Sequence, residues 1–429
     1  MPLNSSAATP SSLKLLAISF FYPPLAAPRS VQVARLLRYT AATASTVLVC
    51  ADEAGGRKDA TLEPGAEDFL FECLRVPFAQ KNWRRQISRV ASRFDLPLWN
   101  RVPDQYRSWK PQAIETIEDF LSRTSFKPDV LVTFGQPMSD HLIGLELHKR
   151  YGWPWVAHFS DPWVDNPFGR FDSLTRRFNS ALERKVMEAA TRLVFTSEET
   201  LELIMKKYER DAYGKARVLP HAFDPRWYDE APAAASPTID SRITVRHLGE
   251  LYGRRSPKPL FDALRSLHSS APESLEDVRF ELIGAVEESV LKDSGFHLLP
   301  EGLVVVKPPV SYQESLSLMT SSNGLVVIDA PMERSVFLPS KLIDYIGAAR
   351  PILGITPQGT SANLINQLGG WLADPVSGQS VVEALGDFLT FLRQNRQGNH
   401  LPWGNEGVRE RYEAMRVARV FEKLIRELL

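Results

Sequence analysis

A glycine- and arginine-rich segment in the second half of the chain has the composition of a phosphate-binding loop. Residues 249–258 have the sequence GELYGRRSPK, and they follow a short apolar run and precede an amphipathic one. A helix start with flexible glycines such as Gly249, together with Arg254, Arg255 and Lys258, could bind a diphosphate. An exposed basic turn before the helix is the alternative interpretation of the same residues.

A second segment, LPSKLIDY at 338–345, combines a lysine and an aspartate near the start of a predicted helix. Pro339 suits a helix start, Lys341 falls in the first turn, and Asp344 lies three residues further on the same side. A lysine in the first turn opposes the helix dipole, and this placement is easier to explain if Lys341 binds an anion. The Asp344 carboxylate could accept hydrogen bonds from ribose hydroxyls, and a local Lys341–Asp344 surface pair is the alternative.

A third candidate, Asp161, lies in HFSDPW at 158–163, directly after an apolar run. Open α/β sheets bind ligands at the carboxyl ends of their strands. We therefore expect the carboxylate of Asp161 to face a ligand, whereas the simpler alternative is an Asx-type turn before Pro162.

Short apolar runs alternate with longer amphipathic segments in both halves of the chain, which is the pattern of parallel sheets covered by helices. In the first half, strands are predicted at 13–21, 45–50, 129–134, 153–159 and 191–196, and helices at 30–41, 137–151 and 173–190. In the second half, strands are predicted at 243–249, 278–284, 303–307, 324–329, 350–355 and 370–374, and helices at 257–269, 311–321, 339–348 and 378–394. Ser311 and Glu314 have the spacing of a capping box at one helix start. The pattern predicts two doubly wound α/β domains in series.

The domain boundaries follow from composition. Residues 1–225 are predicted to form an N-terminal domain, the Pro-, Ala- and Ser-rich residues 226–242 a linker, and residues 243–403 a C-terminal domain. Residues 404–429 predict one terminal helix that packs back toward the N-terminal domain, because apolar side chains recur there at 3–4 spacing. These side chains are Val408, Tyr412, Met415, Phe421, Leu424 and Leu428.

A basic and aromatic insert at 75–110 interrupts the α/β pattern. It carries nine Lys and Arg residues against two Asp residues. Six aromatic residues are interleaved with them: Phe78, Trp83, Phe94, Trp99, Tyr106 and Trp109. This mixture suits the headgroup region of an anionic membrane. A solvated helical face whose aromatic residues pack on the domain is the alternative.

Composition excludes several classes of function. The 429 residues contain 51 Lys and Arg and 51 Asp and Glu, and this neutral balance argues against a dedicated nucleic-acid-binding protein. Two cysteines rule out a disulfide scaffold. The patterns GxGxxG, GxxxxGK[ST], HExxH and GxSxG are missing, so no standard dinucleotide, P-loop, metal or hydrolase motif is predicted. No signal peptide or membrane-spanning run is apparent, which leads us to expect a cytoplasmic protein.

Four segments together resemble the retaining glycosyltransferases of family four, which have the GT-B fold. These segments are PDVLVTFGQPMSDHLIGLELHKRYGWPWVAHFSDPW (128–163), VLPHAFDPRWY (218–228), HLGELYGRRSPKPLFDAL (247–264) and FLPSKLIDYIGAARPIL (337–353). The last of them is similar to the Pro-Ser-Lys donor motif of the polysaccharide-assembly branch. Several positions depart from the family pattern. After Tyr22-Pro23-Pro24, which looks like the opening loop of the family, Ala26-Ala27 stands where the family usually has a glycine pair, and His221-Ala222 stands where it usually has Asn-Gly. Val336 occupies the position of the first paired glutamate, with Asp344 in place of the second, and Ser160 occupies the position of the usual histidine.

The resemblance implies a GT-B fold, with two Rossmann-like domains facing a central cleft, and a glycosyltransferase that retains anomeric configuration without a metal. It implies that Gly249, Arg254, Arg255, Lys258 and Lys341 bind the diphosphate of a UDP-sugar or GDP-sugar and that Asp344 binds the ribose. The residues implied in catalysis are Asp161, Arg255 and Lys341.

The acceptor implied is a glycan, expected to be polyprenyl-linked and bound to the N-terminal domain at the cytoplasmic face of a membrane. Cell-surface or exopolysaccharide biosynthesis is the expected process, and nucleic acid is not an expected partner. A catalytically weak donor-binding scaffold, to which Val336 and Ser160 point, and a nucleotide-sugar epimerase are the alternatives.

Overall fold

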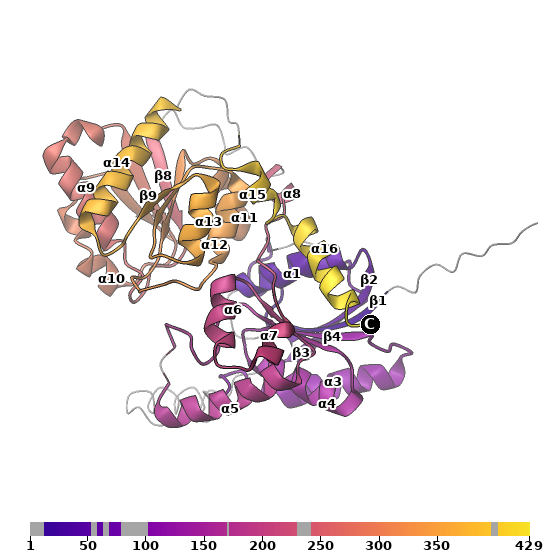
Figure 1. Cartoon of the computed structure of the whole chain (residues 1–429). Helices are drawn as coiled ribbons and strands as arrows, with labels where there is room; N and C mark the ends of the chain where they lie inside the picture. Colours follow the sequence, from indigo (N-terminus) through magenta and orange to yellow (C-terminus); the bar gives the residue numbers. More distant parts are fainter. Residues whose placement is uncertain are drawn as a thin grey trace, which may run out of the picture. The chain divides into compact units, whose positions relative to one another are not determined.

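The computed structural model describes residues 13–52, 58–62, 68–78, 102–169, 171–229, 242–395 and 402–429. The chain divides into two compact units (Figure 1). Unit 1 contains Met1–Thr196, Leu203–Leu219 and Ala418–Leu429, and unit 2 contains Ser197–Glu202 and Pro220–Val417. The chain therefore passes from one unit to the other more than once.

Unit 1 is built on a parallel sheet with the strand order β3-β2-β1-β4-β5-β6-β7. The strands are β1 (Leu13–Ile18), β2 (Ala44–Asp52), β3 (Glu72–Pro77), β4 (Val130–Gly135), β5 (Trp155–Phe159), β6 (Arg192–Phe195) and β7 (Ala216–Val218). In the register, Leu15 lies between Thr46 of β2 and Val130 of β4. Every residue of β4, β5 and β6 is buried, as expected for central strands covered on both faces.

The helices of unit 1 cover both faces of this sheet (Figure 1). They are α1 (Pro28–Thr40), α3 (Trp109–Arg123), α4 (Ser139–Tyr151), α5 (Ser173–Ala189) and α7 (Arg210–Gly214), while α6 (Glu198–Met205) begins in unit 2. The strand order reverses at β1, and right-handed crossovers therefore place α1 on one face and α3, α4 and α5 on the other. Helices α3, α4 and α5 thus form one continuous layer.

Unit 2 is a second parallel sheet with the strand order β10-β9-β8-β11-β12-β13. The strands are β8 (Ile243–Leu248), β9 (Val278–Ile283), β10 (Val304–Lys307), β11 (Gly324–Ile328), β12 (Ile352–Ile355) and β13 (Trp371–Ala373). The helices are α8 (Arg226–Asp229), α9 (Lys258–Ser270), α10 (Glu288–Asp293), α11 (Tyr312–Thr320), α12 (Ser340–Ala348), α13 (Thr360–Leu368), α14 (Gly378–Gln394) and α15 (Glu406–Glu410), with short 3-10 turns at Pro272–Ser274 and Phe296–Leu298.

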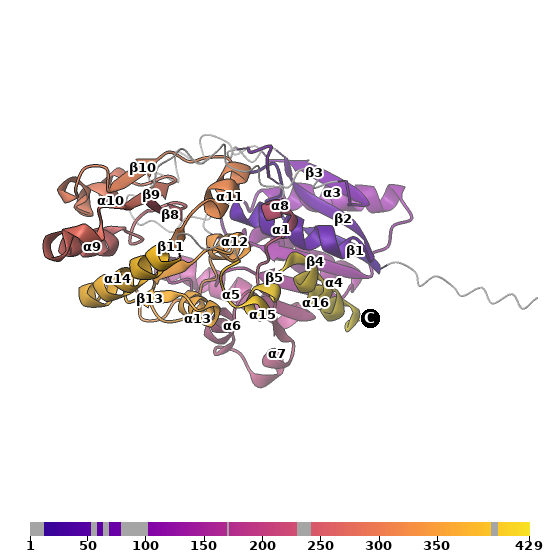
Figure 2. The ribbon, with the colours of Figure 1, turned by 90° about the horizontal axis from the view of Figure 1, so that it is seen from above.

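Two apolar cores lie on opposite faces of the unit 2 sheet. One core packs α9 and α14 against the strands through side chains such as Phe261 and Phe388, and the other packs α11, α12 and α13 through Leu316, Leu342 and Ile365. Figure 2 shows α9 and α14 on one side of the strands and α11 and α12 on the other. The predicted fold class, two Rossmann-like parallel α/β units, is confirmed.

The strands and helices predicted from periodicity are all present, with ends that shift by a few residues. The predicted capping box also begins α11, because the Ser311 side chain accepts a hydrogen bond from the Glu314 amide. Strands β3 and β7 and several helices, among them α3, α6, α10 and α13, were not predicted. Strand β3 is half-exposed at the sheet edge, so its residues alternate poorly, and β7 has only three residues.

The C-terminal segment differs from the single helix predicted for 404–429. It forms α15 and then α16 (Ala414–Arg426), because the backbone around Glu413 pairs with Phe223 and interrupts the helix. The Phe223 amide donates to the Tyr412 carbonyl at 2.9 Å, and the Ala414 amide donates to the Phe223 carbonyl at 2.8 Å. Met415, predicted to belong to the buried stripe, is 49% exposed. Of the predicted linker, residues 226–229 form α8, and residues 230–241 lie outside the described residues.

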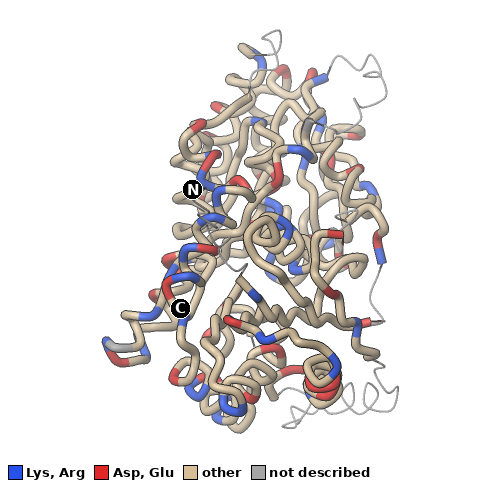
Figure 3. The backbone as a smooth tube through the Cα atoms, turned by 90° about the vertical axis from the view of Figure 1, so that its right-hand side faces the viewer, with Lys and Arg blue, Asp and Glu red and all other residues tan. Residues whose placement is uncertain are grey.

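Most of the basic insert, residues 79–101, lies outside the described residues, and Trp83, Phe94 and Trp99 lie with it. Two of the described aromatic residues of the insert belong to the core of unit 1. Phe78 is 4% exposed and Trp109 is fully buried, whereas Tyr106 is partly exposed and its ring packs 4.3 Å from that of Phe20. Phe78 and Trp109 are therefore not available for insertion into a membrane. Along the described backbone, Lys and Arg are interspersed with Asp and Glu (Figure 3).

Candidate functional site

The carboxyl end of β8 brings a glycine and a lysine together in unit 2. Gly249 has a φ of 142°, and Gly284 on the neighbouring strand has a φ of 143°, values that residues with side chains rarely adopt. A Cβ on Gly249 would lie 2.5 Å from Lys341 Nζ, and one on Gly284 would overlap the Gly249 carbonyl. Glycine at 249 therefore allows the Lys341 ammonium to approach the backbone at the end of this strand.

His247, within β8, supplies the described hydrogen-bond partner of Lys341. Its Nδ1 is 3.0 Å from the Val326 carbonyl oxygen, which only accepts, so Nδ1 carries the proton. Its Nε2 is therefore free to accept from Lys341 Nζ at 3.4 Å. Burial, and then the positive charge of Lys341, lower the pKa of His247 well below its usual value, so this imidazole is neutral.

The ammonium of Lys341 is only partly compensated. No carboxylate of the described residues forms an ion pair with it. Burial, and second the nearby charge of Arg255, lower the pKa of Lys341 from 10.5 to about 7, with opposing effects from Asp329 and Glu250. Lys341 is the second residue of α12, where the helix dipole also disfavours a cation. An anion bound here would restore the charged form of the lysine.

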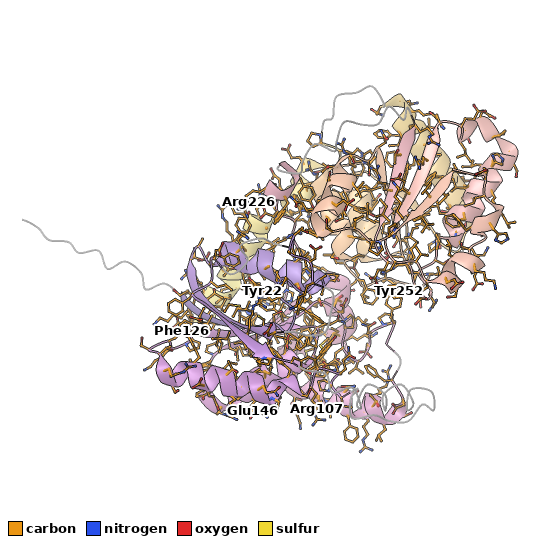
Figure 4. The ribbon with its side chains drawn as sticks, turned by 180° about the vertical axis from the view of Figure 1, so that it is seen from behind. Tyr22, Arg107, Phe126, Glu146, Arg226 and Tyr252 are labelled. Atoms are coloured by element: carbon orange, nitrogen blue, oxygen red, sulfur yellow. The ribbon has the colours of Figure 1, made fainter. Side chains whose placement is uncertain are left out.

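Arg255 lies beside the same strand ends. Its Nη2 is 3.4 Å from the Asp329 carboxylate, which follows β11 and also accepts from the Thr356 hydroxyl at 3.1 Å. Its Nε is buried and has no hydrogen-bond partner in the described part of the chain. The guanidinium lies 5.5 Å from the centre of the Tyr252 ring, which is labelled in Figure 4. Arg255 thus keeps a buried donor available for a ligand.

Two other residues of the predicted phosphate loop point elsewhere. Arg254 is exposed and donates to the Pro331 carbonyl at 2.6 Å. Lys258 is the first residue of α9, and its 53% exposed side chain forms an i,i+4 ion pair with Asp262 at 2.9 Å. The structure brings Gly249, Arg255 and Lys341 together but gives Lys258 a surface pair instead.

Asp344 and Lys341 contact different segments of unit 2. The Asp344 carboxylate accepts from the Tyr312 hydroxyl at 2.8 Å and from the Tyr228 hydroxyl at 3.3 Å, and the residue is 8% exposed. The alternative surface pair between Lys341 and Asp344 does not form. A Cβ on Gly347, one turn further along the helix, would overlap the Tyr228 ring, which explains this glycine within a helix. The ribose role of Asp344 stays a prediction.

In unit 1, Asp161 follows β5 and lies within the electrostatic reach of a buried arginine. Arg29, at the second position of α1, is 6% exposed and donates from Nη2 to His158 Nδ1 at 3.0 Å. A guanidinium cannot accept, so His158 carries its proton on Nε2. Burial lowers the pKa of Arg29 to about 10, while the charges of Asp161 and Asp140 oppose this shift.

The sequence interpretation did not single out Arg29, His158, His247 or Asp329. Arg29 offers the same signal that identified Lys341, a cation in the first turn of a helix that follows a strand. Asp329 is the acidic residue directly after the apolar run of β11. The two histidines give no comparable signal, because a single histidine in an apolar strand is commonly a packed core residue.

A pocket of about 530 Å³ lies near the carboxyl ends of β1, β4 and β5 in unit 1. Aromatic rings and amide groups dominate its lining, together with the buried carboxyl of Asp104. The aromatic and amide residues are Phe21, Tyr106, Trp163, Phe171, Gln105, Gln136 and Asn166. Such a lining combines apolar surface with groups that donate or accept hydrogen bonds, which suits a polar organic ligand.

Val336 and Ser160, two of the positions that depart from the family pattern, have structural contacts. The Val336 carbonyl accepts hydrogen bonds from the hydroxyls of Ser197 and Thr200, each at 2.8 Å. The Ser160 hydroxyl donates to the Gly135 carbonyl at 3.3 Å. Across the described ranges, no group of three or more His, Cys, Asp or Glu side chains could hold a metal ion. No helix in the same ranges is long and apolar enough to cross a membrane.

Comparison with known proteins identifies a matching protein family for the first half of the chain and a shared fold for nearly all of it. Residues 26–220 match the family described as "Glycosyl transferase 4-like domain". No curated protein matches the chain significantly in sequence.

Three solved structures share the fold over nearly the whole chain. Sucrose-phosphate synthase from Thermosynechococcus elongatus is 13% identical with a TM-score of 0.68, covering 97% of this chain and 99% of its own. Anabaena Alr3699/HepE in complex with UDP and glucose is 12% identical with a TM-score of 0.64, covering 97% and 100%. Trehalose-6-phosphate from E. coli bound with UDP-2-fluoro glucose is 14% identical with a TM-score of 0.65, covering 97% and 99%. The chain thus has the two-domain fold of GT-B glycosyltransferases, and its residues 26–220 match the glycosyltransferase 4-like domain.

Proposed function

We propose that this protein is a glycosyltransferase that moves a sugar from a nucleotide-sugar donor to a glycan acceptor with retention of configuration. The observation that carries the proposal is the cluster of Gly249, Arg255 and Lys341 at the carboxyl end of β8. It holds two cations. The Lys341 ammonium has no ion-pair partner among the described residues, and the buried Arg255 Nε has no hydrogen-bond partner among them. Those are the properties of a site that can bind a diphosphate.

The donor in this proposal is a UDP-sugar, with a GDP-sugar as the second choice. Two of the similar solved structures hold UDP or UDP-2-fluoro glucose, which supports this class of donor. The diphosphate would contact Arg255 and Lys341. A ribose hydroxyl would donate a hydrogen bond to Asp344 in place of one of the tyrosine hydroxyls that donate to it in this structure. Arg254 and Lys258 would have to turn away from their present partners to join them.

Leaving-group stabilisation is the chemistry these residues can supply. As the bond between the sugar and the diphosphate breaks, negative charge grows on the departing phosphate oxygens. Arg255 and Lys341 are already positioned in a partly buried site, so they offset that charge without reorganisation. In this proposal their two charges do the work that a metal ion does in other transferases.

The acceptor is assigned to unit 1. The pocket of about 530 Å³ lined by Phe21, Tyr106 and Trp163 supports a sugar ligand, since aromatic faces and amides suit the apolar faces and hydroxyls of a sugar ring. The charge of Asp161 acts on the buried guanidinium of Arg29. In this proposal the Asp161 carboxylate contacts the acceptor. We propose a lipid-linked glycan, extended at the cytoplasmic face of a membrane in cell-surface or exopolysaccharide assembly.

Calorimetry with UDP and GDP tests the donor site. Replacing Arg255 with Ala should weaken UDP binding by about 1.5–3 kcal/mol, the scale of a hydrogen bond to a charged group. Lys292→Ala, an exposed lysine of α10, is the matched control and should bind UDP as the wild type does. Equal UDP affinity in Arg255→Ala and in the wild type would mean that the diphosphate binds elsewhere.

A donor-binding scaffold with little activity is the second candidate. It is favoured by Ser160, whose hydroxyl is committed to the Gly135 carbonyl where the family has histidine, and by Val336 in place of a glutamate. Turnover of a UDP-sugar with a polyprenyl-linked acceptor separates the two candidates. The transferase yields a glycosylated lipid whose new linkage keeps the anomeric configuration of the donor by NMR, whereas the scaffold binds UDP and yields none.

A further inference from the structure

A groove of about 640 Å³ runs between α4 and α5 on the helical layer of unit 1. Each helix contributes one stripe at i, i+3, i+4 and i+7 spacing. The stripe of α4 runs Leu142, Leu145, Glu146, Lys149, and that of α5 runs Phe178, Ala181, Leu182, Lys185. Parallel crossovers make these two helices run in the same direction, so both stripes start apolar and end in lysine at the same end of the groove.

The rim of the groove is strongly basic. Five cations line it, namely Arg107, Lys110, Lys149, Arg150 and Lys185, against the single carboxylate of Glu146. Arg107 and Glu146, both labelled in Figure 4, line the groove.

The one carboxylate of the groove is already engaged. Lys110 pairs with Glu146 at 2.7 Å, and Arg150 pairs with Glu146 at 2.5 Å and with Glu118. The bond from Lys110 is the main cause that lowers the pKa of Glu146, so this carboxylate is ionised. Lys149 and Lys185 are exposed, and no ion pair to either is present among the described residues.

Apolar side chains stand exposed beside these charges. On α5, Leu174 is 46% exposed and Phe178 is 41% exposed, one turn apart on the same stripe as Lys185. Leu142 and Leu145 form the floor on α4 and are 9% and 8% exposed. The surface therefore presents apolar groups at one end, a hydrophobic floor and two uncompensated ammonium groups at the other end.

We propose that this groove binds the headgroup of an anionic phospholipid in a bilayer, with Lys149 and Lys185 on the phosphate and Leu174 and Phe178 in the headgroup–acyl boundary. Anionic headgroups attract lysines near the surface, and exposed apolar side chains add burial, so the two features reinforce each other only at a membrane. The inference rests on the proposed function, because a lipid-linked acceptor requires the protein at a membrane. It assigns the attachment to α4 and α5, which the structure describes, and not to residues 78–101.

Vesicle co-sedimentation of the full chain tests the assignment. Wild type should bind vesicles of phosphatidylcholine with about 30% phosphatidylglycerol at low salt, bind pure phosphatidylcholine weakly, and lose binding as salt rises. Lys149→Glu/Lys185→Glu should reduce partitioning about thirtyfold or more, since each lysine contributes about fivefold and reversal of the charge adds repulsion. Lys127→Glu/Lys292→Glu, the same charge change at exposed lysines outside the groove, is the matched control and should stay within about twofold of wild type.

A second variant protects the test against misfolding. Phe178→Ser removes an exposed ring, leaves every charge in place, and should reduce partitioning to anionic vesicles while leaving its salt dependence unchanged. The thermal unfolding transition of every variant is measured without ligand, because a cooperative transition near that of the wild type shows that the chain is folded. The shift that UDP produces is measured separately, as the readout of the donor site.

The outcomes separate this inference from the proposed function. The groove is not the membrane-binding site if Lys149→Glu/Lys185→Glu binds vesicles as well as the wild type does. If binding is lost only in Arg84→Glu/Arg85→Glu/Arg89→Glu/Arg93→Glu, the basic insert is the attachment site instead. Binding of glycerol 3-phosphate by calorimetry without binding to vesicles also overturns the groove assignment, since the groove would then take a soluble anion. A chain that binds anionic vesicles through the groove but shows no UDP shift supports the groove and counts against the donor site.

Discussion

Replacing Lys341 with Met should stabilise the unliganded protein at pH 6. Lowering the pKa of this ammonium from 10.5 to about 7 corresponds to about 5 kcal/mol at 1.36 kcal/mol per pKa unit, which is the upper limit of the cost of burying the charge. Water reaches the half-buried side chain, and Asp329 and Glu250 offset part of the cost, so we expect about 2–3 kcal/mol. For a unit of this size that is about 5–10 °C in Tm.

The pH dependence gives the prediction its sign. The folded-state pKa lies below the unfolded one, so the unfolded wild type binds more protons between about pH 7 and 10.5. Wild-type stability therefore rises with pH in that window, by up to about 1.4 kcal/mol per pH unit, whereas methionine has no such dependence. The advantage of Lys341→Met should shrink above pH 7 and disappear near pH 9–10.

Thermal unfolding from pH 6 to 10 measures both effects, with Lys292→Met on α10 as the control for losing an exposed lysine. Lys341→Met should also lose most of the Tm increase that UDP gives the wild type, because ligand binding stabilises by mass action. If the variant is no more stable than the wild type at pH 6, or if its stability advantage stays constant to pH 10, the inference that Lys341 is a half-buried cation without a full compensating charge is wrong.

Three further changes test the remaining contacts. Gly249→Ala places a methyl group 2.5 Å from Lys341 Nζ at a φ of 142°, and we expect UDP affinity by calorimetry to fall at least about tenfold. Asp344→Asn should weaken uridine as well as UDP if the carboxylate binds ribose, and a loss confined to UDP would disprove that role. Arg29→Met removes the hydrogen bond that Arg29 donates to His158, so sugar transfer should fall at least about tenfold while UDP affinity stays unchanged; weakened UDP binding would count against an acceptor-side role. In the wild type, UDP affinity should fall as pH rises through about 7, because Lys341 loses its proton; an affinity that is flat from pH 6 to 9 would contradict this.

Much of the fold was predictable because fully buried parallel strands must be apolar on both faces. Strands such as β4 and β11 therefore stand out as continuous apolar runs in the sequence. Strand β3 does not, since one side of an edge strand faces solvent. The break before α16 was not predictable either, because it depends on a backbone pairing between Phe223 and Glu413, which are far apart in the sequence.

The candidate site was predictable where a residue conflicts with its local surroundings. Lys341 opposes a helix dipole, and that conflict identified it before any contact was known. Asp344 has no such conflict, and its partners Tyr228 and Tyr312 come from distant segments, so its environment could not be inferred. The surface pair of Lys258 with Asp262, by contrast, follows from simple i,i+4 spacing and could have been recognised.

The multiple crossings between the two units constrain the order in which the chain can fold during synthesis. Phe421 and Ile425 are fully buried, and Arg192 pairs with Glu427 at 3.2 Å, all within unit 1. A ribosome delivers residues 13–219 long before residues 418–429, so unit 1 waits with part of its apolar surface uncovered while all of unit 2 is made. Unit 2 needs only one earlier piece, Ser197–Glu202, and can close first. Nascent chains stalled before residue 418 therefore leave apolar surface of unit 1 exposed to aggregation, and a truncation there removes most of α16, including the buried side chains that belong to unit 1.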